Sequence, residues 1–356
     1  MKKELLIASA LVGSLGLAGV AEAASATMSG HQRVGVQGTD VDSADASNTS
    51  SQLSGFTVSI SETTDSGITI STGFDLAEEN GGLDASGLTL AFASGAKLDL
   101  IEAGNAATTH VATVPSGSGE FLVTAGTVSN APSAITFADA GDNVGFEFHT
   151  AADAFGVEGL KASISFSTNG DAANTTGVHT DAGMYSVGAS YVSTAGDSTV
   201  TIGAGMYQGS STATDSLDDT EAFVISASAV TGNLTIGLGY ANGTDMGTGS
   251  TTNVDGEATA WTVTGASVVT AGAKYVSGDM TLSVGVVDGS GNDGAAEAAV
   301  TGSDDSYNAT SASVDYAVAS GVTATVGYSA IQRGDDGASV TANSGSSWYV
   351  GATVSF

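Results

Sequence analysis

From residue 24 onward, apolar residues alternate with Ser, Thr or Gly at every second position. In Ser198–Tyr207, Val200, Ile202 and Ala204 fall on one face of an extended chain, and Thr and Gly fall on the other. A period of two is typical of strands whose two faces meet different surroundings. β-Branched and aromatic residues are frequent in these runs, and helix-periodic stretches are missing. The pattern therefore predicts an all-β protein.

The connections between these runs alternate between short and long. Short turns such as 194–197 and 277–279 alternate along the chain with long acidic segments such as 168–183 and 289–306. Barrels that span an outer membrane have short periplasmic turns and long extracellular loops. The alternation predicts a transmembrane antiparallel β-barrel of about 16 strands, with an even count between about 14 and 18. The expected strands are 25–37, 53–61, 67–76, 109–115, 120–128, 143–149, 159–167, 184–193, 198–208, 221–230, 233–242, 264–276, 279–288, 307–319, 321–332 and 347–356.

The pattern is weakest in 77–119. Leu88–Leu100 also alternates there. This stretch can form an extra hairpin within a long loop, or it can replace the strand expected at 109–115.

The size of such a barrel decides which face points inward. Sixteen tilted strands close into a barrel on the order of 30 Å across. Ser, Thr and Gly are too small to fill that space, so the polar face must line water and the apolar face must meet lipid. Because unpaired backbone groups are intolerable in hydrocarbon, the sheet must also be closed.

The first residues have the features of a secretory signal. Lys2 and Lys3 precede an apolar stretch, 5–20, and Ala21-Glu22-Ala23 carries small residues where a signal peptidase needs them. We therefore expect a signal peptide in 1–23 and a barrel in 24–356. A retained membrane anchor is the alternative, although the apolar run is shorter than the roughly 20 residues of a spanning helix.

The charge balance limits the function. The chain has 7 Lys and Arg against 38 Asp and Glu, a formal net charge of -31, and no Cys. Nucleic acid is excluded as a partner because phosphate binding needs basic clusters, and thiol chemistry is excluded as well. Most carboxylates fall in the long segments, where Lys97 and Arg333 are the basic residues. A pore entrance surrounded by such acidic loops concentrates cations, which predicts a cation-selective pore.

The last strand carries a family resemblance. Apolar residues occupy every second position and the chain ends on an aromatic: Trp348, Val350, Ala352, Val354 and Phe356. This pattern resembles the signal by which the insertion machinery recognises outer-membrane barrels. The chain as a whole resembles the Gram-negative general porins, particularly those of alphaproteobacteria. Phe121–Ala131 resembles that family's strand before the constriction loop, and Val144–His149 resembles the strand after it.

The resemblance implies a homotrimer in the outer membrane of a Gram-negative bacterium, surrounded by lipid and lipopolysaccharide. It implies passive diffusion of ions and small hydrophilic solutes through a pore in each subunit. It also implies that the third extracellular loop, here 129–142, folds into the barrel and narrows it.

Strand parity assigns several charged side chains to the lumen. Charged groups on the lipid face near mid-membrane cost about 2–4 kcal/mol for Arg or Lys, so a lumen position is favoured. In the functional interpretation, the cations oppose acidic residues across the narrowest point; the alternative is that all are solvated wall residues. The cations are Arg33, Lys161 and Lys274, the opposing acids are Asp139, Asp142 and Glu147, and Asp75 and Asp315 add negative charge to the lumen.

Two acidic clusters have enough oxygen atoms to bind Ca²⁺. They are Asp288 with Asp293, and Asp215 with Asp218 and Asp219. Neither has the EF-hand spacing. They are therefore candidate calcium sites. The alternatives are that divalent ions bridge these loops to lipopolysaccharide, or that the loops are simply solvated. No other cofactor is expected.

Catalytic motifs are missing from the sequence. The histidines at 31, 110, 149 and 179 are scattered, with no HExxH pair, GxSxG elbow or P-loop. We therefore expect a channel and not an enzyme, although an outer-membrane protease or lipase would also suit a barrel. A substrate-selective channel in the same barrel is a second hypothesis, and a non-channel secreted or surface β-protein is a third.

Overall fold

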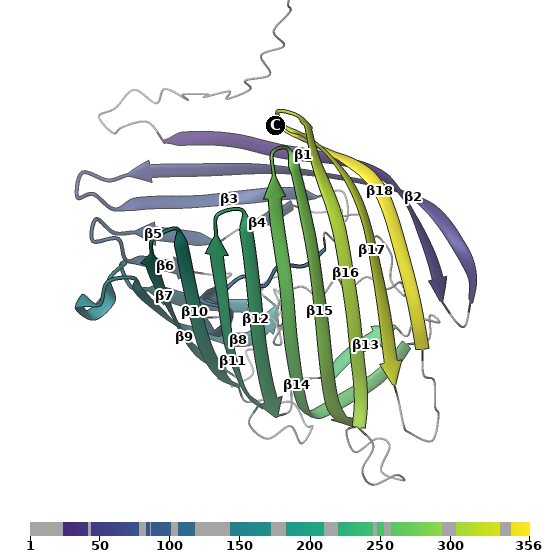
Figure 1. Cartoon of the computed structure of the whole chain (residues 1–356). Coiled ribbons are helices and arrows are strands. Elements are labelled where there is room, and N and C mark those ends of the chain that lie inside the picture. The colour runs from purple at the N-terminus through teal and green to yellow at the C-terminus, as the bar shows by residue number, and fades with distance from the viewer. Residues whose placement is uncertain are drawn as a thin grey trace, which may run out of the picture.

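The strands of the protein form one sheet that closes on itself into a barrel (Figure 1). The computed structural model describes residues 24–41, 44–77, 83–85, 87–100, 106–117, 143–171, 183–209, 220–244, 248–252, 258–293, 304–334 and 343–356. Within these residues, no helix has the length and apolar character needed to cross a membrane. The all-β transmembrane barrel predicted from the sequence is confirmed.

The elements follow one another in chain order. The first half comprises β1 (Ser25–Val41), β2 (Ala44–Thr63), β3 (Thr69–Ala77), β4 (Leu83–Ala85), β5 (Leu88–Ala91), β6 (Lys97–Leu100), the helix α1 (Ala106–Thr109), β7 (Asn143–His149), the 3-10 helix η1 (Ala154–Gly156) and β8 (Leu160–Asp171). The second half comprises β9 (Gly183–Ala195), β10 (Ser198–Gly209), β11 (Thr220–Thr231), β12 (Leu234–Thr244), β13 (Thr248–Thr252), β14 (Ala258–Ser277), β15 (Met280–Asp293), β16 (Asp304–Ala319), β17 (Val322–Gly334) and β18 (Asn343–Ser355).

The barrel closes where the first strand meets the last. β1 pairs with β2 on one edge and with β18 on the other, in register from His31 opposite Ser355 to Val41 opposite Gly345. Phe356 extends this ladder, because its N–H and C=O exchange two hydrogen bonds of 3.0 Å with Gly30. No sheet edge is left between the two ends, as a wall in hydrocarbon requires.

The wall has the expected number of strands in the part of the chain that the structure describes. The closed circuit contains 16 antiparallel strands. β4 and β5 both pair with β3 and act as one interrupted strand, whereas β13 pairs only with β14 and is not part of the closed circuit. All neighbours around the circuit are antiparallel, so long and short connections fall at opposite ends.

Two predicted wall positions are wrong. Leu88–Leu100 forms the hairpin of β5 and β6, and β6 pairs directly with β7, so these two strands take the two places in the wall expected for 109–115 and 120–128. Residues 106–109 are helical instead, and 110–117 contain no strand. Pro115 gives a physical reason, since proline cannot donate to a β-ladder. The strand expected at 120–128 and the loop at 129–142 lie outside the described residues.

The hairpin turns account for the short connections. Gly196, Gly232 and Gly278 each start a two-residue turn with a positive φ between 55° and 60°. Glycine at this position is typical of the type II′ turn, which matches the twist of the flanking strands. At the opposite end the strands extend further than expected. β1 and β2, for example, reach Val41 and Ala44, so most of the loop expected at 38–52 is a β-hairpin.

Candidate functional site

The two faces of the barrel wall differ in chemistry. One face carries large apolar side chains that are half exposed, such as Ile164 (52%), Leu238 (61%) and Val326 (52%). The opposite face carries small polar residues such as Ser163 and Ser226, which are buried. An exposed apolar band this extensive is unfavourable in water and favourable in lipid. The apolar face is therefore the lipid face, and the serine-rich face is the lumen face.

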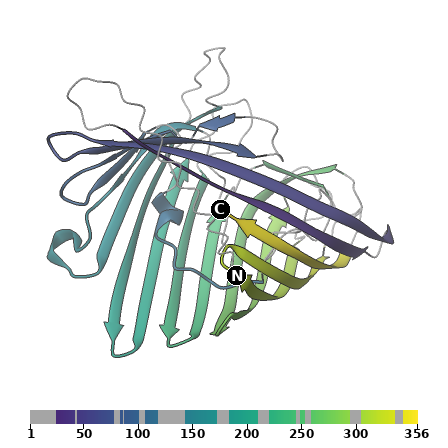
Figure 2. The same cartoon turned by 90° about the horizontal axis from the view of Figure 1, so that it is seen from above.

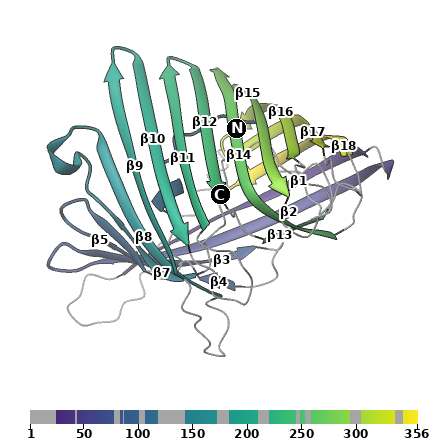
Figure 3. The same ribbon diagram turned by 90° about the horizontal axis from the view of Figure 1, so that it is seen from below.

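Residues 106–117, here called the inner segment, lie against the lumen face. Figures 2 and 3 show its short blue helix inside the ring of strands. Three of its backbone N–H groups donate to serine hydroxyls on the wall, with N···O distances of 2.7–3.1 Å. The pairs are Ala106 with Ser165 on β8, Ala112 with Ser226 on β11, and Gly117 with Ser311 on β16. The inner segment therefore runs along the lumen face of the wall, from β8 past β11 to β16.

Glycines on the wall make this close approach possible. A Cβ atom added to any of six of them would lie less than 3.0 Å from the backbone of the inner segment, a separation that real Cβ atoms essentially never show. The six lie on five strands that the inner segment crosses: Gly188, Gly203, Gly205, Gly237, Gly272 and Gly285. Glycine weakens a strand, and in a strand interior it often marks the close approach of another backbone. Here that backbone is the inner segment.

An apolar contact fixes the middle of the inner segment. Ala107 packs with Tyr207, Ala222, Val224 and Ala241, and Val111 packs against this cluster. Ala222 and Val224 are lumen-facing positions that break the polar alternation of β11, so they would be out of place against water. Their burial beneath the inner segment explains the exception.

A polar network joins the helix of the inner segment to the wall. Ring nitrogens of His110 lie 2.7 Å from Ser163 Oγ and 3.0 Å from Ser190 Oγ. Next to it, Thr109 Oγ1 donates to Glu147 Oε1 at 2.6 Å. Ser163 Oγ is also 2.8 Å from His149 Nδ1, so the two histidines share one hydroxyl.

The pKa of His110 is lowered from its ordinary value of 6.5. Burial of the ring is the largest cause, and the nearby His149 and Lys161 add to it. The neutral ring is therefore the form that the docked inner segment favours.

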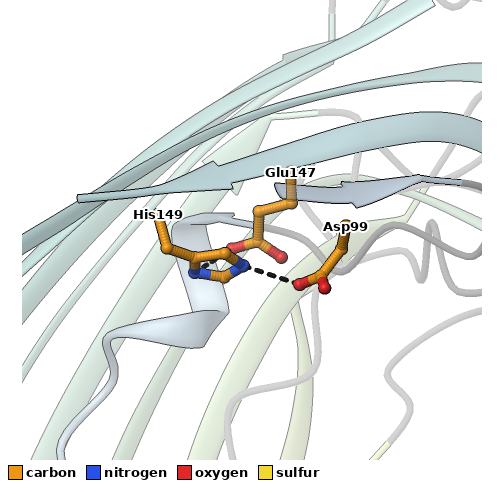
Figure 4. A group of neighbouring side chains, drawn as sticks. All are labelled: Asp99, Glu147 and His149. Atoms are coloured by element: carbon orange, nitrogen blue, oxygen red, sulfur yellow. Dashed lines mark hydrogen bonds and ion pairs between the residues drawn. The ribbon is translucent and has the colours of Figure 1, made fainter. Parts of the chain in front are cut away.

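Glu147, His149 and Asp99 form a compact group on β7 and β6 (Figure 4). His149 Nε2 lies 2.8 Å from Asp99 Oδ2, and His149 Nδ1 lies 3.7 Å from Glu147 Oε1. Lys97 Nζ also reaches Asp99 Oδ2 at 2.8 Å. Register explains the grouping, because Asp99 lies opposite Glu147 and Lys97 lies opposite His149 in the ladder between β6 and β7.

The charged residues expected in the lumen are distributed around the whole wall. By register they share the lumen face: Arg33 on β1, Asp75 on β3, Glu147 on β7, Lys161 on β8, Lys274 on β14 and Asp315 on β16. Asp315 accepts a hydrogen bond of 2.7 Å from Thr325. Asp139 and Asp142 lie outside the described residues.

Two expectations about these charges need correction. Lys161 does not oppose Glu147 across the lumen, since β8 and β7 are neighbours in the same stretch of wall. Lys97, expected in a long extracellular segment, lies on the barrel strand β6. The position of Lys97 follows from the β5–β6 hairpin, which supplies two wall strands where the sequence suggested a loop. The position of Lys161 follows from the direct pairing of β7 with β8.

The structure also changes the calcium hypothesis for one cluster. Asp288 and Asp293 lie on one continuous strand, β15. Five residues of extended chain separate them by about 17 Å, which is too far for both to bind one ion. Asp215, Asp218 and Asp219 lie outside the described residues, so a calcium site there stays a prediction.

Sequence reasoning missed the residues of the network: Asp99, Thr109, His110, His149 and Ser163. The histidines are 39 positions apart in the chain, which made them look unrelated. One signal was available, because Lys97-Leu98-Asp99-Leu100 alternates as a strand does. That alternation indicates a wall strand with Lys97 and Asp99 on the lumen face.

The model for the Gram-negative porin family matches residues 8–337, so the chain belongs to this family. The family and the closed barrel together indicate a channel of the bacterial outer membrane. No curated protein matches the chain.

Solved structures with the same fold include several porins. One structure described simply as a porin is 20% identical, with a TM-score of 0.63, over 93% of this chain and all of the other. The trimer form of OmpT from Vibrio cholerae is 14% identical, with a TM-score of 0.60, over 94% of this chain and all of the other. The anion-selective porin from Comamonas acidovorans is 13% identical, with a TM-score of 0.58, also over 94% of this chain and all of the other. At these identities the likeness concerns the fold alone.

Proposed function

We propose that the protein is a passive diffusion pore for ions and small hydrophilic solutes, that it prefers cations, and that the inner segment narrows it. The observation that carries the proposal is the path of the inner segment across the lumen face from β8 to β16. A barrel of 16 strands is on the order of 30 Å across, so one such segment narrows the lumen without filling it.

Cation preference rests on the charge of this chain. The same fold occurs in a porin described as anion-selective, so the barrel alone does not set the sign of the selectivity. Here the formal net charge is -31, because the chain has 38 Asp and Glu against 7 Lys and Arg. Negative groups at a pore concentrate cations, and the effect weakens as salt shortens the Debye length.

Planar bilayers test both parts of this proposal. A reversal potential across a salt gradient should have the sign of cation preference, and it should shrink when the salt concentration is raised. The current should grow with ion concentration without saturating. Anion preference would refute the selectivity, no current would refute the pore, and saturation by one solute would favour a substrate-selective channel.

Cross-linking tests the position of the inner segment. The chain has no Cys, so an introduced pair is free of competing thiols. Ala112→Cys with Ser226→Cys should form a disulfide on oxidation, because the Ala112 N–H is 2.7 Å from the Ser226 hydroxyl. The matched control is Ala112→Cys with Ser228→Cys, since Ser228 lies about 7 Å further along β11. Equal cross-linking of both pairs would contradict the docked position.

Several finer points belong to the same proposal. We expect a homotrimer, in line with the OmpT structure described as a trimer form, embedded among lipid and lipopolysaccharide and inserted by recognition of the last strand. We also expect the alphaproteobacterial type, removal of 1–23, and no enzymatic activity. The molecular mass of the purified complex in detergent tests the trimer.

A further inference from the structure

We propose that Asp99, Glu147 and His149 form a binding site for a divalent transition metal ion, Zn²⁺ in the first instance, on the pore wall beside the inner segment. Each side chain offers one ligand atom, and these atoms all lie within 4.8 Å of one another. Figure 4 shows a dashed line from one ring nitrogen of His149 to Asp99 and from the other to Glu147.

The burial of Glu147 is an independent reason to expect a cation here. Its side chain is only 2% exposed. Among the described residues, no Lys or Arg reaches it, and its partners are the Thr109 hydroxyl and the His149 ring. A buried carboxylate is costly unless a cation or several hydrogen bonds compensate for its charge. A dication in contact with Glu147 and Asp99 would supply that compensation.

The donor set favours a transition metal over calcium or magnesium. One imidazole nitrogen with two carboxylate oxygens suits Zn²⁺, whereas Ca²⁺ and Mg²⁺ take oxygen ligands. Ligand atoms around a four-coordinate zinc ion stand about 3.4 Å apart, given bonds of about 2.0–2.2 Å. Small rotations of the two carboxylates therefore bring the donors from the separations seen here to a shared ion.

The surroundings already orient the imidazole. Ser163 Oγ, 2.8 Å from His149 Nδ1, binds one nitrogen and leaves Nε2 directed at Asp99. Metal-bound histidines are commonly held in this way, by a hydrogen bond to the other ring nitrogen. Ser163 is itself tied to His110 of the inner segment, which restrains the whole arrangement.

The Lys97 ammonium competes with the metal ion for the Asp99 carboxylate. Its ammonium lies 2.8 Å from Asp99 Oδ2, the same oxygen that faces His149 Nε2. The Lys97 side chain is 42% exposed, so it can move into the lumen when the ion binds. Removing the ammonium should therefore strengthen metal binding, whereas a purely structural ion-pair network would show no such gain.

The experiment measures Zn²⁺ binding to the full-length folded barrel in detergent by competition with a chromophoric chelator. We expect one ion per chain, affinity at least about tenfold weaker in His149→Ala and Glu147→Gln, and tighter binding in Lys97→Met. His31→Ala, which changes a histidine at the barrel seam, is the matched control and should bind as the unchanged protein does. Circular dichroism of each variant separates lost binding from lost folding.

Several outcomes would overturn the site. They are the absence of Zn²⁺ binding, unchanged affinity in a folded His149→Ala barrel, or equal competition by Ca²⁺. A second measurement rests on the proposed pore function: micromolar Zn²⁺ should reduce the cation current of the unchanged protein and leave that of His149→Ala unaffected. Binding without any current would refute the pore alone, and a current indifferent to Zn²⁺ together with no binding would refute the site alone.

Discussion

The lumen face of the barrel has two regions that use glycine differently. Under the inner segment, glycines such as Gly205 and Gly272 make room for a second stretch of backbone. At the seam, where β18 lies between β17 and β1, Gly327 makes room for the ring of Tyr349. Backbone cannot move aside without breaking hydrogen bonds, whereas a side chain can rotate. The same residue type is therefore rigidly required in one region and replaceable at modest cost in the other.

Truncation of the last strand, which pairs with β1 at the seam, should have the largest effect on assembly of the barrel. Removal of residues 347–356 takes away most of the strand that pairs with both β1 and β17. Each unpaired backbone group in hydrocarbon costs several kcal/mol, so the barrel should fail to close. The measurement is the yield of heat-modifiable barrel in the outer membrane.

The conservative change Phe356→Leu is the control for this truncation. It keeps both backbone hydrogen bonds to Gly30 and should assemble far better. Normal yield of the truncated chain would show that closure does not depend on this ladder.

A matched pair of glycine substitutions tests the comparison directly. Gly205→Ala should cost about 3 kcal/mol and displace the inner segment, because the new methyl group meets the Ala107 backbone. Gly327→Ala should cost less, about 1–2 kcal/mol, since the buried Tyr349 ring can shift without breaking a strand hydrogen bond. Unfolding in denaturant gives the stabilities, and single-channel recording should show altered conductance for Gly205→Ala only. Similar losses of stability in both variants would contradict the distinction between a glycine that faces backbone and a glycine that faces a side chain.

Two serines provide a smaller test of the same contrast. Ser226→Ala leaves the buried N–H of Ala112 without its acceptor, which should cost about 1–3 kcal/mol and increase current noise. Ser329→Ala removes a hydroxyl pair with Ser347 at the seam, at 2.8 Å, and should leave the current unchanged. A noisy Ser329→Ala pore would mean that noise does not report on the inner segment.

The smallest effect expected is a pH dependence of docking. Because the pKa of His110 is lowered in the docked state, docking is strongest above pH 6.5 and weakens as the pH falls below it. Protonation would place a positive charge on His110 close to the Lys161 ammonium, with Glu147 close to Thr109 as the facing carboxylate. Relative to a free thiol at the same pH, thiol labelling of Ala112→Cys should therefore be faster at pH 5 than at pH 7.5.

His110→Gln, combined with Ala112→Cys, is the variant that isolates this effect. It keeps a polar group near Ser163 but cannot titrate, so its labelling rate should not change with pH beyond the reagent's own dependence. Equal acceleration in both proteins would assign the effect to another group.

The strands of the barrel wall could be predicted from the sequence, whereas the segment that packs inside the wall could not. The sequence predicts strands such as β10 and β18 closely, because alternation with a period of two is the direct consequence of a wall with one lipid face and one lumen face. The wall hairpin β5–β6 is harder to place, because each strand has only four residues and the alternation in Leu88–Leu100 suits either a loop hairpin or a pair of wall strands. Residues 109–115 were misassigned because an extended segment that packs on a wall also carries mixed apolar and polar residues.

The sequence by itself determined the closed barrel, its lipid and lumen faces and its excess of negative charge. These properties arise from local alternation, composition and turn chemistry, which each stretch of chain carries on its own. Only the tertiary structure decided which segment enters the lumen and that Asp99, Glu147 and His149 meet beside it. The physical reason is register: pairing of β6 with β7 brings distant residues opposite one another, and complementary glycines and serines on several strands together select the docked segment.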